Sequence, residues 1–186
     1  MRIIGGRFKG RALASVGKGD AGAHLRPTTD RIRESLFNVL QGGTYGDPIT
    51  DAYVLDLFAG TGALGLEALS RGAAHVTFVD DGRKAQSLIA ENIRLTNSKA
   101  QSTVLRRDAT RLPTNTGPHA MLVFLDPPYG TSLGVKALTA AQQNNWLASG
   151  ALIIFEDSSP APPLPNFERL SDRRYGDTHI TFLEVP

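Results

Sequence analysis

The stretch Val54-Leu-Asp-Leu-Phe-Ala-Gly-Thr-Gly-Ala-Leu-Gly-Leu-Glu-Ala-Leu69 decides the fold class of this sequence. Its first five residues are almost wholly apolar, as in a parallel strand that is buried on both faces. Three glycines follow, and the apolar residues after them predict a helix that ends near Gly72. A strand, a glycine turn and a helix in this order form the opening unit of a nucleotide-binding α/β fold, because glycine lets backbone amides approach a ligand closely.

Two acidic residues indicate which ligand this unit binds. Asp80 closes the next apolar run, about twenty positions after the glycines, where an acidic residue commonly binds a ribose diol. Asp56 lies inside the first strand, where a carboxylate would repel a pyrophosphate and would suit a ligand with an amino group and a sulfonium. The unit therefore predicts an adenosyl cofactor site, with S-adenosylmethionine favoured over NAD.

Strands and helices alternate along the rest of the chain. Further strands are predicted at 75–79, 103–107, 121–125, 151–155, 167–175 and 178–185, and helices at 83–97 and from 133 towards Trp146. This order predicts a Rossmann-like α/β fold with a mostly parallel, seven-stranded sheet and an antiparallel C-terminal hairpin. Ligands of such sheets bind beyond the carboxyl ends of the strands, where Asp56, Asp80, Asp108 and Asp126 are all expected.

A single domain spanning residues 1–186 is expected, with two segments before the catalytic core of 51–186. Residues 1–23 read as a basic β-ribbon and linker. Residues 24–50 read as a capping turn and a helix with a core-facing stripe of Ile32, Leu36, Val39 and Leu40, from which Arg31 and Arg33 point away. Phe8 in the ribbon is expected to be available for stacking on a base.

The charge distribution favours a polyanionic partner at the N-terminus. Residues 1–40 contain eight Lys and Arg against three Asp and Glu, whereas the rest contains twelve against fifteen. The chain has no cysteine, no apolar run long enough to span a membrane and no secretory leader, so a cytoplasmic protein is expected. The four histidines form no convincing ligand pair, and no metal is expected.

The tetrapeptide Asp126-Pro-Pro-Tyr129 indicates the chemistry. Two prolines after a buried strand fix an extended turn and remove two amide donors. The Asp126 carboxylate and the Pro127 carbonyl could then accept both hydrogens of an exocyclic amine, while Tyr129 stacks on a planar base. Drawing such an amine out of its ring plane localises its lone pair towards an electrophilic methyl group.

These motifs resemble those of class I S-adenosylmethionine-dependent amino-methyltransferases. The block Arg26-Pro-Thr-Thr-Asp-Arg-Ile-Arg-Glu-Ser-Leu-Phe-Asn38, with Met1-Arg-Ile-Ile-Gly-Gly6 and Tyr175-Gly-Asp-Thr178, is similar to the RsmD family. That family methylates N2 of one guanine in 16S ribosomal RNA. The resemblance covers nearly the whole chain and implies 16S rRNA or the small ribosomal subunit as partner. A monomer is expected.

The resemblance also implies roles for individual residues. It assigns the cofactor to Asp56, Phe58, Ala59, Gly60, Thr61, Gly62, Asp80, Asp108 and Ala109. It assigns the target guanine to Asp126, Pro127, Pro128 and Tyr129, and RNA contacts to Arg2, Arg7, Lys9, Arg11, Arg26, Thr28 and Arg31.

Other functions stay open from the residues alone. The same tetrapeptide could hold adenine N6 in nucleic acid or the amide of a protein glutamine. A non-catalytic RNA-binding assembly factor could keep the same fold, although the intact Asp126 and glycine loop argue against it. An NAD oxidoreductase fits poorly, because no second domain remains to hold a substrate.

Overall fold

A twisted seven-stranded sheet organises the computed structural model, which describes residues 1–15 and 29–186. The strand order is β3-β2-β1-β4-β5-β7-β6. The parallel strands are β1 (Tyr53–Leu57), β2 (His75–Val79), β3 (Ser102–Leu105), β4 (Ala120–Leu125) and β5 (Leu147–Asp157). The antiparallel strands are β6 (Glu168–Tyr175) and β7 (Thr178–Glu184). The predicted mostly parallel sheet with a C-terminal hairpin is confirmed.

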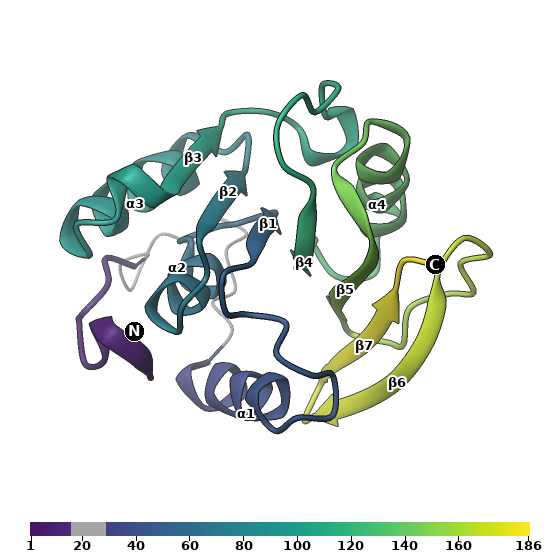
Figure 1. Cartoon of the computed structure of the whole chain (residues 1–186), viewed down its shortest axis with the longest axis horizontal. Coiled ribbons are helices and arrows are strands. Elements are labelled where there is room, and N and C mark those ends of the chain that lie inside the picture. Colours follow the sequence, from purple (N-terminus) through teal and green to yellow (C-terminus); the bar gives the residue numbers. More distant parts are fainter. Residues whose placement is uncertain (16–28) are drawn as a thin grey trace.

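Helices cover both faces of the sheet (Figure 1). One face carries α1 (Asp30–Gln41), α2 (Ala63–Ser70) and α3 (Arg83–Leu95), and the other carries α4 (Leu133–Gln143). Short 3-10 helices occur at η1 (Gly6–Phe8), η2 (Lys99–Gln101) and η3 (Ala109–Arg111). Within residues 1–15 and 29–186, no helix is both long enough and apolar enough to cross a membrane.

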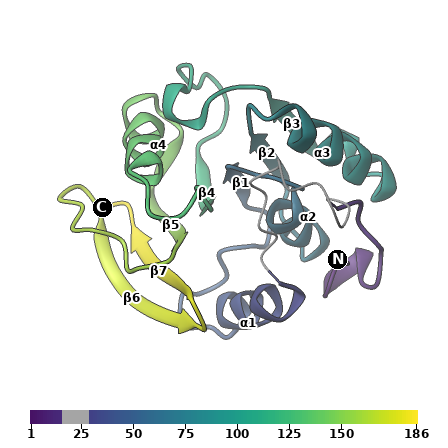
Figure 2. The ribbon, with the colours of Figure 1, turned by 180° about the vertical axis from the view of Figure 1, so that it is seen from behind.

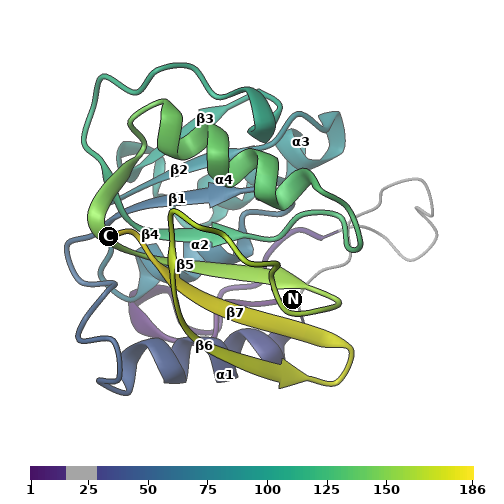
Figure 3. The same cartoon turned by 90° about the vertical axis from the view of Figure 1, so that its right-hand side faces the viewer.

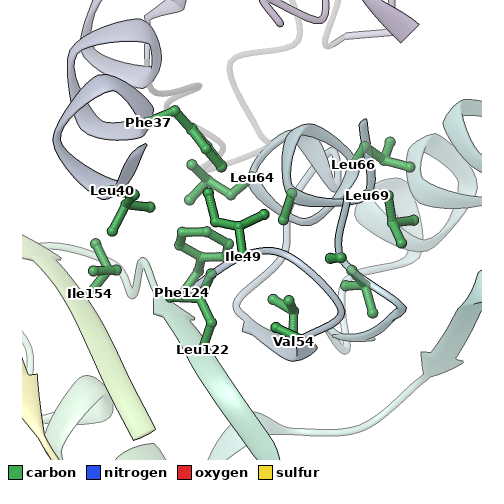
Figure 4. Close-up of a cluster of buried hydrophobic side chains, with 14 of the residues drawn as sticks. Phe37, Leu40, Ile49, Val54, Leu64, Leu66, Leu69, Leu122, Phe124 and Ile154 are labelled. Atoms are coloured by element: carbon green, nitrogen blue, oxygen red, sulfur yellow. The ribbon is translucent and has the colours of Figure 1, made fainter. Parts of the chain in front are cut away.

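Alternate residues of the buried strands form two hydrophobic clusters, one on each face. Figure 4 shows the cluster between the sheet and the helices α1 and α2, where Phe37 packs against Phe124 with 5.7 Å between ring centroids. The second cluster joins α4 and η3 to the opposite face. Burial on both faces explains the continuous apolar runs of β1 and β4 in the sequence.

Helix α1 departs from the predicted pattern at one position. Thr29 is its N-cap, with the hydroxyl accepting a hydrogen bond from the Ile32 amide, and Leu36 and Leu40 are buried as expected. Arg33, however, was predicted to point away from the core and is instead 0% exposed. The Asp30 carboxylate lies 2.9 Å from its guanidinium and the Glu67 carboxylate on α2 lies 3.8 Å from it, so acidic partners from its own helix and from a second helix compensate its charge.

The N-terminal segment is paired but is not a regular β-ribbon. Arg2 and Ala12 form an isolated antiparallel bridge, and η1 occupies the bend between them. Ile3 and Leu13 are buried in the core cluster beside α2, and Figure 2 shows this segment next to α2. We call residues 1–15 the N-terminal arm. The arm is part of the packed core, because its apolar side chains Ile3 and Leu13 are buried against the rest of the protein.

Strand β5 begins earlier than the predicted start at residue 151. Helix α4 ends at Gln143, after which Asn145 adopts a left-handed conformation with φ of 60°. The chain therefore turns back at once, and Leu147 pairs with Ala120 before a register irregularity.

Candidate active site

The register of the parallel strands aligns their carboxyl ends in one row. Leu57 pairs with Val79 and with Leu125, Val79 pairs with Leu105, and Leu125 pairs with Phe155. The residues one position after these paired residues are therefore neighbours along one edge of the sheet: Phe58, Asp80, Arg106, Asp126 and Glu156. In Figure 3 the loops after β4 and β5 and the β6–β7 turn extend on this same side. The strand order reverses between β1 and β4, which is where such folds bind ligands.

The loop after β1 is held in an unusual backbone conformation. Phe58 and Gly60 have φ of 59° and 58°, in the left-handed region, which is costly for a residue with a bulky side chain such as Phe58. The Gly60 amide donates to Asp80 Oδ2 at 2.9 Å, and the Ala59 amide donates to the Val79 carbonyl at 3.1 Å. Contacts to β2 thus hold this loop over the carboxyl edge.

Gly65 and Asp56 join the start of α2 to β1. The Gly65 amide donates to Asp56 Oδ2 at 3.0 Å, and a Cβ on Gly65 would lie 2.5 Å from the Phe78 ring. Only glycine therefore lets the helix pack this close. Asp56 is 1% exposed, and burial raises its pKa to about 8. Its carboxyl group is shielded from solvent and holds the start of α2 through the hydrogen bond from Gly65.

Asp80 uses both carboxylate oxygens on the backbone around it. Oδ2 accepts the Gly60 amide, and Oδ1 accepts the Gly82 amide at 2.9 Å. Burial raises the pKa of Asp80 in spite of these hydrogen bonds. Each carboxylate oxygen has a second lone pair, so Asp80 can hold the loop and also accept hydrogen bonds from a diol.

Asp108 caps η3 beyond the end of β3. Its Oδ1 accepts hydrogen bonds from the Thr110 amide and hydroxyl at 2.8 and 2.7 Å, and these bonds lower its pKa. Ala109 is buried beside it. Asp108 therefore stays ionised at neutral pH, and its Oδ2 lies 3.8 Å from the guanidinium of the exposed Arg111.

The loop after β4 contains the predicted tetrapeptide. The Asp126 amide donates to the Leu57 carbonyl at 3.3 Å, so this loop starts beside the glycine loop. Pro127 is buried, and the Pro128 carbonyl accepts the Thr131 hydroxyl at 2.7 Å. The Tyr129 hydroxyl donates to Glu156 Oε1 at 2.6 Å and lies 3.2 Å from Thr178 Oγ1. Burial is the larger cause that raises the pKa of Tyr129, and the hydrogen bond to Glu156 raises it further.

The predicted RNA-binding side chains of the N-terminal arm and of α1 lie at the surface. Arg2, Lys9 and Arg11 of the arm and Arg31 of α1 are exposed, and the exposed Arg7 contacts Gln101. Phe8 is not available for stacking as expected, because it packs on the core and the Arg7 guanidinium lies 4.5 Å from its ring centroid. Arg26 and Thr28 lie outside the described residues.

The arm is also connected to the glycine loop. The buried Asn92 side chain accepts the Ala14 amide at 2.7 Å and donates to the Thr61 carbonyl at 2.9 Å. Glu67 accepts the Ile4 and Gly5 amides, each at 2.8 Å. The arm is therefore held by its backbone, which leaves its basic side chains at the surface.

Sequence reasoning assigned no role in the site to four polar residues of this region: Glu67, Asn92, Glu156 and Thr178. A signal for Glu156 was present, because it directly follows the predicted strand 151–155, just as Asp80 and Asp126 follow theirs, although β5 itself continues to Asp157. Glu67 and Asn92 lie on helices among apolar residues and gave no comparable signal.

A hollow of about 460 Å³ lies elsewhere, lined by Arg7, Asp51, Arg71, Ala74 and Gln101 among others. These residues are close to the amino ends of β1, β2 and β3. The hollow is therefore at the opposite edge of the sheet from Asp80 and Asp126 and is separate from the candidate active site.

Comparison with known proteins gives consistent matches over nearly the whole chain. The model of a family described as Conserved hypothetical protein 95 matches residues 1–184. Ribosomal RNA small subunit methyltransferase D of Escherichia coli (strain K12) is 42% identical over 164 residues, which cover 84% of this chain and 74% of that protein. The protein of the same name from Haemophilus influenzae is 38% identical over 166 residues, covering 87% and 81%. A solved structure of Escherichia coli yhhF, described as a methyltransferase, has a TM-score of 0.81 at 34% identity and covers 100% of this chain and 97% of its own.

Proposed function

Because the chain belongs to the Conserved hypothetical protein 95 family, together with ribosomal RNA small subunit methyltransferase D, we propose that it methylates the exocyclic N2 amine of a guanine in 16S ribosomal RNA. The methyl donor would be S-adenosylmethionine. The observation that carries the proposal is the position of the Asp126–Tyr129 loop beside the glycine loop, at the reversal of strand order.

The residues around the glycine loop fit an adenosyl cofactor. Asp80, one place beyond β2, has acceptor capacity for two ribose hydroxyls, and the ionised Asp108, with Ala109, suits the adenine amino group. The loop from Phe58 to Gly62 would contact the methionine and ribose parts. Asp56 would act on the cofactor mainly through the loop and helix that it supports. When bound, the cofactor supplies an electrophilic methyl group on a sulfonium.

The loop after β4 fits the acceptor amine. Asp126 and the Pro127 carbonyl would accept the two amine hydrogens and orient the nitrogen lone pair towards the methyl group. The amine becomes transiently cationic as it attacks, so the Asp126 carboxylate would stabilise the developing charge and take up a proton. Tyr129 would stack on the base.

The exposed cations of the N-terminal arm support an RNA substrate. Arg2, Arg7, Lys9 and Arg11 project from a backbone that Glu67 and Asn92 hold in place. Their charges would contact phosphates without a change in the fold of the arm. Arg26, Thr28 and Arg31 complete the proposed RNA contacts.

The proposal is tested by incubating the protein with tritium-labelled S-adenosylmethionine and either naked 16S rRNA or assembled small subunits. Nucleoside analysis should find the label in N2-methylguanosine. Label in N6-methyladenosine would contradict the guanine assignment, and no transfer to either RNA would contradict the methyltransferase assignment.

Two variants then separate the two halves of the site. Asp126→Ala should lower the single-turnover rate on the order of 10²–10³-fold, because one preorganised electrostatic partner is lost, while cofactor affinity stays nearly unchanged. Asp80→Ala should instead weaken cofactor binding by about 1.5–3 kcal/mol, measured by titration calorimetry. A wild-type rate in Asp126→Ala would rule out its amine-holding role.

A further inference from the structure

The Tyr129 side chain is tethered by its hydroxyl to the neighbouring strands. It donates to Glu156 Oε1 on β5 at 2.6 Å and lies 3.2 Å from Thr178 Oγ1 on β7. Glu156 is 4% exposed, so this carboxylate lies inside the protein. A hydrogen bond to a buried carboxylate is short and strong, and it fixes the position of the far end of the ring.

The backbone after Tyr129 is tethered to the same strand. The Gly130 amide donates to Asp157 Oδ1 at 3.0 Å, and Asp157 is also buried. Two consecutive residues of β5 therefore hold two consecutive residues of the loop after β4. The peptide is fixed at Gly130 and the ring is fixed at its hydroxyl, so rotation of the Tyr129 side chain is restricted at both ends.

Glu156 lies level with Asp126 along the sheet, although β4 ends at Leu125 and β5 continues to Asp157. Both lie one residue beyond the registered pair Leu125 and Phe155. Glu156 therefore belongs to the row of polar residues that forms the candidate active site. A buried carboxylate has a large desolvation cost, and an apolar residue at such a position is often at least as stabilising. Stability alone thus gives a poor reason for a glutamate here.

We propose that Glu156 is a positioning residue for methyl transfer, which orients the ring of Tyr129 so that the target base stacks beside Asp126, with Thr178 as a second contact. This inference rests on the proposed function, because it needs a planar base with an exocyclic amine as substrate. It also assigns the Tyr129 hydroxyl to anchoring. The raised pKa of Tyr129 keeps this hydroxyl protonated, so it remains a donor throughout the physiological pH range.

The test is a double-mutant cycle on the single-turnover methylation rate at saturating RNA and cofactor. Tyr129→Phe and Glu156→Ala each remove the same hydrogen bond, so each should lower the rate about tenfold. The double variant should be no slower than the slower single variant, because the contact can be lost only once. Glu156→Gln keeps an acceptor oxygen and should stay within roughly threefold of the wild-type rate.

Controls distinguish positioning from support of the fold. Cofactor affinity and the urea midpoint of Glu156→Gln should match those of the wild type. Glu184→Gln, at the far end of the same β5–β7 pairing where Glu184 faces Leu152, should leave the rate unchanged. The inference would be overturned if the fold-decrease in rate of the double variant equalled the product of the two single decreases, or if Glu156→Ala kept the wild-type rate.

The same experiment separates this inference from the proposed function. If the wild-type protein methylates an RNA amine other than guanine N2, the guanine assignment fails, and the cycle is measured on that amine. If the wild type methylates guanine N2 and the cycle shows no shared contact, only the role of Glu156 fails. A wild-type protein that methylates no nucleic-acid amine overturns both.

Discussion

Asp56 shows how burial changes the chemistry of a single residue in this protein. Its carboxyl lies under the first turn of α2, 1% exposed, with the Gly65 amide as a hydrogen-bond donor. Burial raises its pKa from an ordinary value of 3.8 to about 8, so the group is protonated in the folded protein at neutral pH. A neutral Asp56 does not repel Asp80 across the base of the glycine loop.

We expect Asp56 to make the stability of the protein depend on pH. Between pH 4 and pH 8 the folded protein binds this proton and the unfolded chain does not, so the contribution is complete below pH 4 and is lost as the pH rises to about 8. Asp56→Asn cannot ionise and should lack this loss, which is on the order of a few kcal/mol. Urea unfolding at pH 5, 6.5 and 8 measures the difference between the two proteins. The exposed Asp81→Asn is the control, and parallel pH curves for wild type and Asp56→Asn would contradict the expectation.

At the scale of elements, the N-terminal arm and α1 are joined to α2 through one buried carboxylate. Glu67 accepts the Ile4 and Gly5 amides, pairs with Arg71 at 2.8 Å and lies 3.8 Å from Arg33. Arg33 in turn donates to the Arg2 carbonyl and to Asp30. Three segments that are distant in the sequence therefore share one buried charge cluster. A cluster of this kind is sensitive to the loss of any one member, because the opposite charge stays buried.

Glu67→Ala should destabilise the protein by about 3–5 kcal/mol, because it removes an acidic partner of the buried Arg33 and of Arg71 and leaves the Ile4 and Gly5 amides without their acceptor. The free energy of unfolding in urea measures this effect. Glu91→Gln on α3 is the matched control, since Glu91 pairs with Arg94 at the surface and its loss should change stability little. Similar losses in both variants would mean that burial of the cluster is not what stabilises the junction.

At the scale of the whole molecule, positive charge is concentrated in the first forty residues, on a body with a slight acidic excess. Removal of the N-terminal arm is a poor test of its role in RNA binding, because Ile3 and Leu13 are buried and Glu67 would lose its amide donors. The arm is both a structural part of the core and the carrier of the exposed cations. Substitution of those cations separates the two roles.

Replacing Arg2, Arg7, Lys9 and Arg11 together by Gln should weaken RNA binding and flatten its salt dependence. The slope of log K against log salt is negative, and each lost phosphate contact makes it shallower by about 0.7–0.9. Cofactor affinity should stay the same, because the backbone of the arm is still held by Glu67 and Asn92. Filter binding over a salt series measures the slope. Lys136→Gln on α4, at the opposite face, is the control, and an unchanged slope in the fourfold variant would remove the arm from the RNA interface.

The sequence by itself determined the order and direction of the strands, the glycine loop, and the row of acidic residues at the strand ends. These features follow from the local period of apolar residues and from turn chemistry, which act over a few neighbouring positions. Even Glu156 was within reach of that reasoning, because it follows the apolar run 151–155 as Asp80 and Asp126 follow theirs.

Only the tertiary structure decided which polar side chains meet. Tyr129 and Glu156 are 27 positions apart, and Ile4 and Glu67 are 63 apart, so no local pattern connects them. The same holds for the burial of Arg33, whose guanidinium meets Glu67 and the Arg2 carbonyl only in the folded protein, and for Asp56, whose pKa depends on the helix packed above it. Burial and pairing of charges are properties of contacts between elements, and these contacts exist only once the sheet and its helices have assembled.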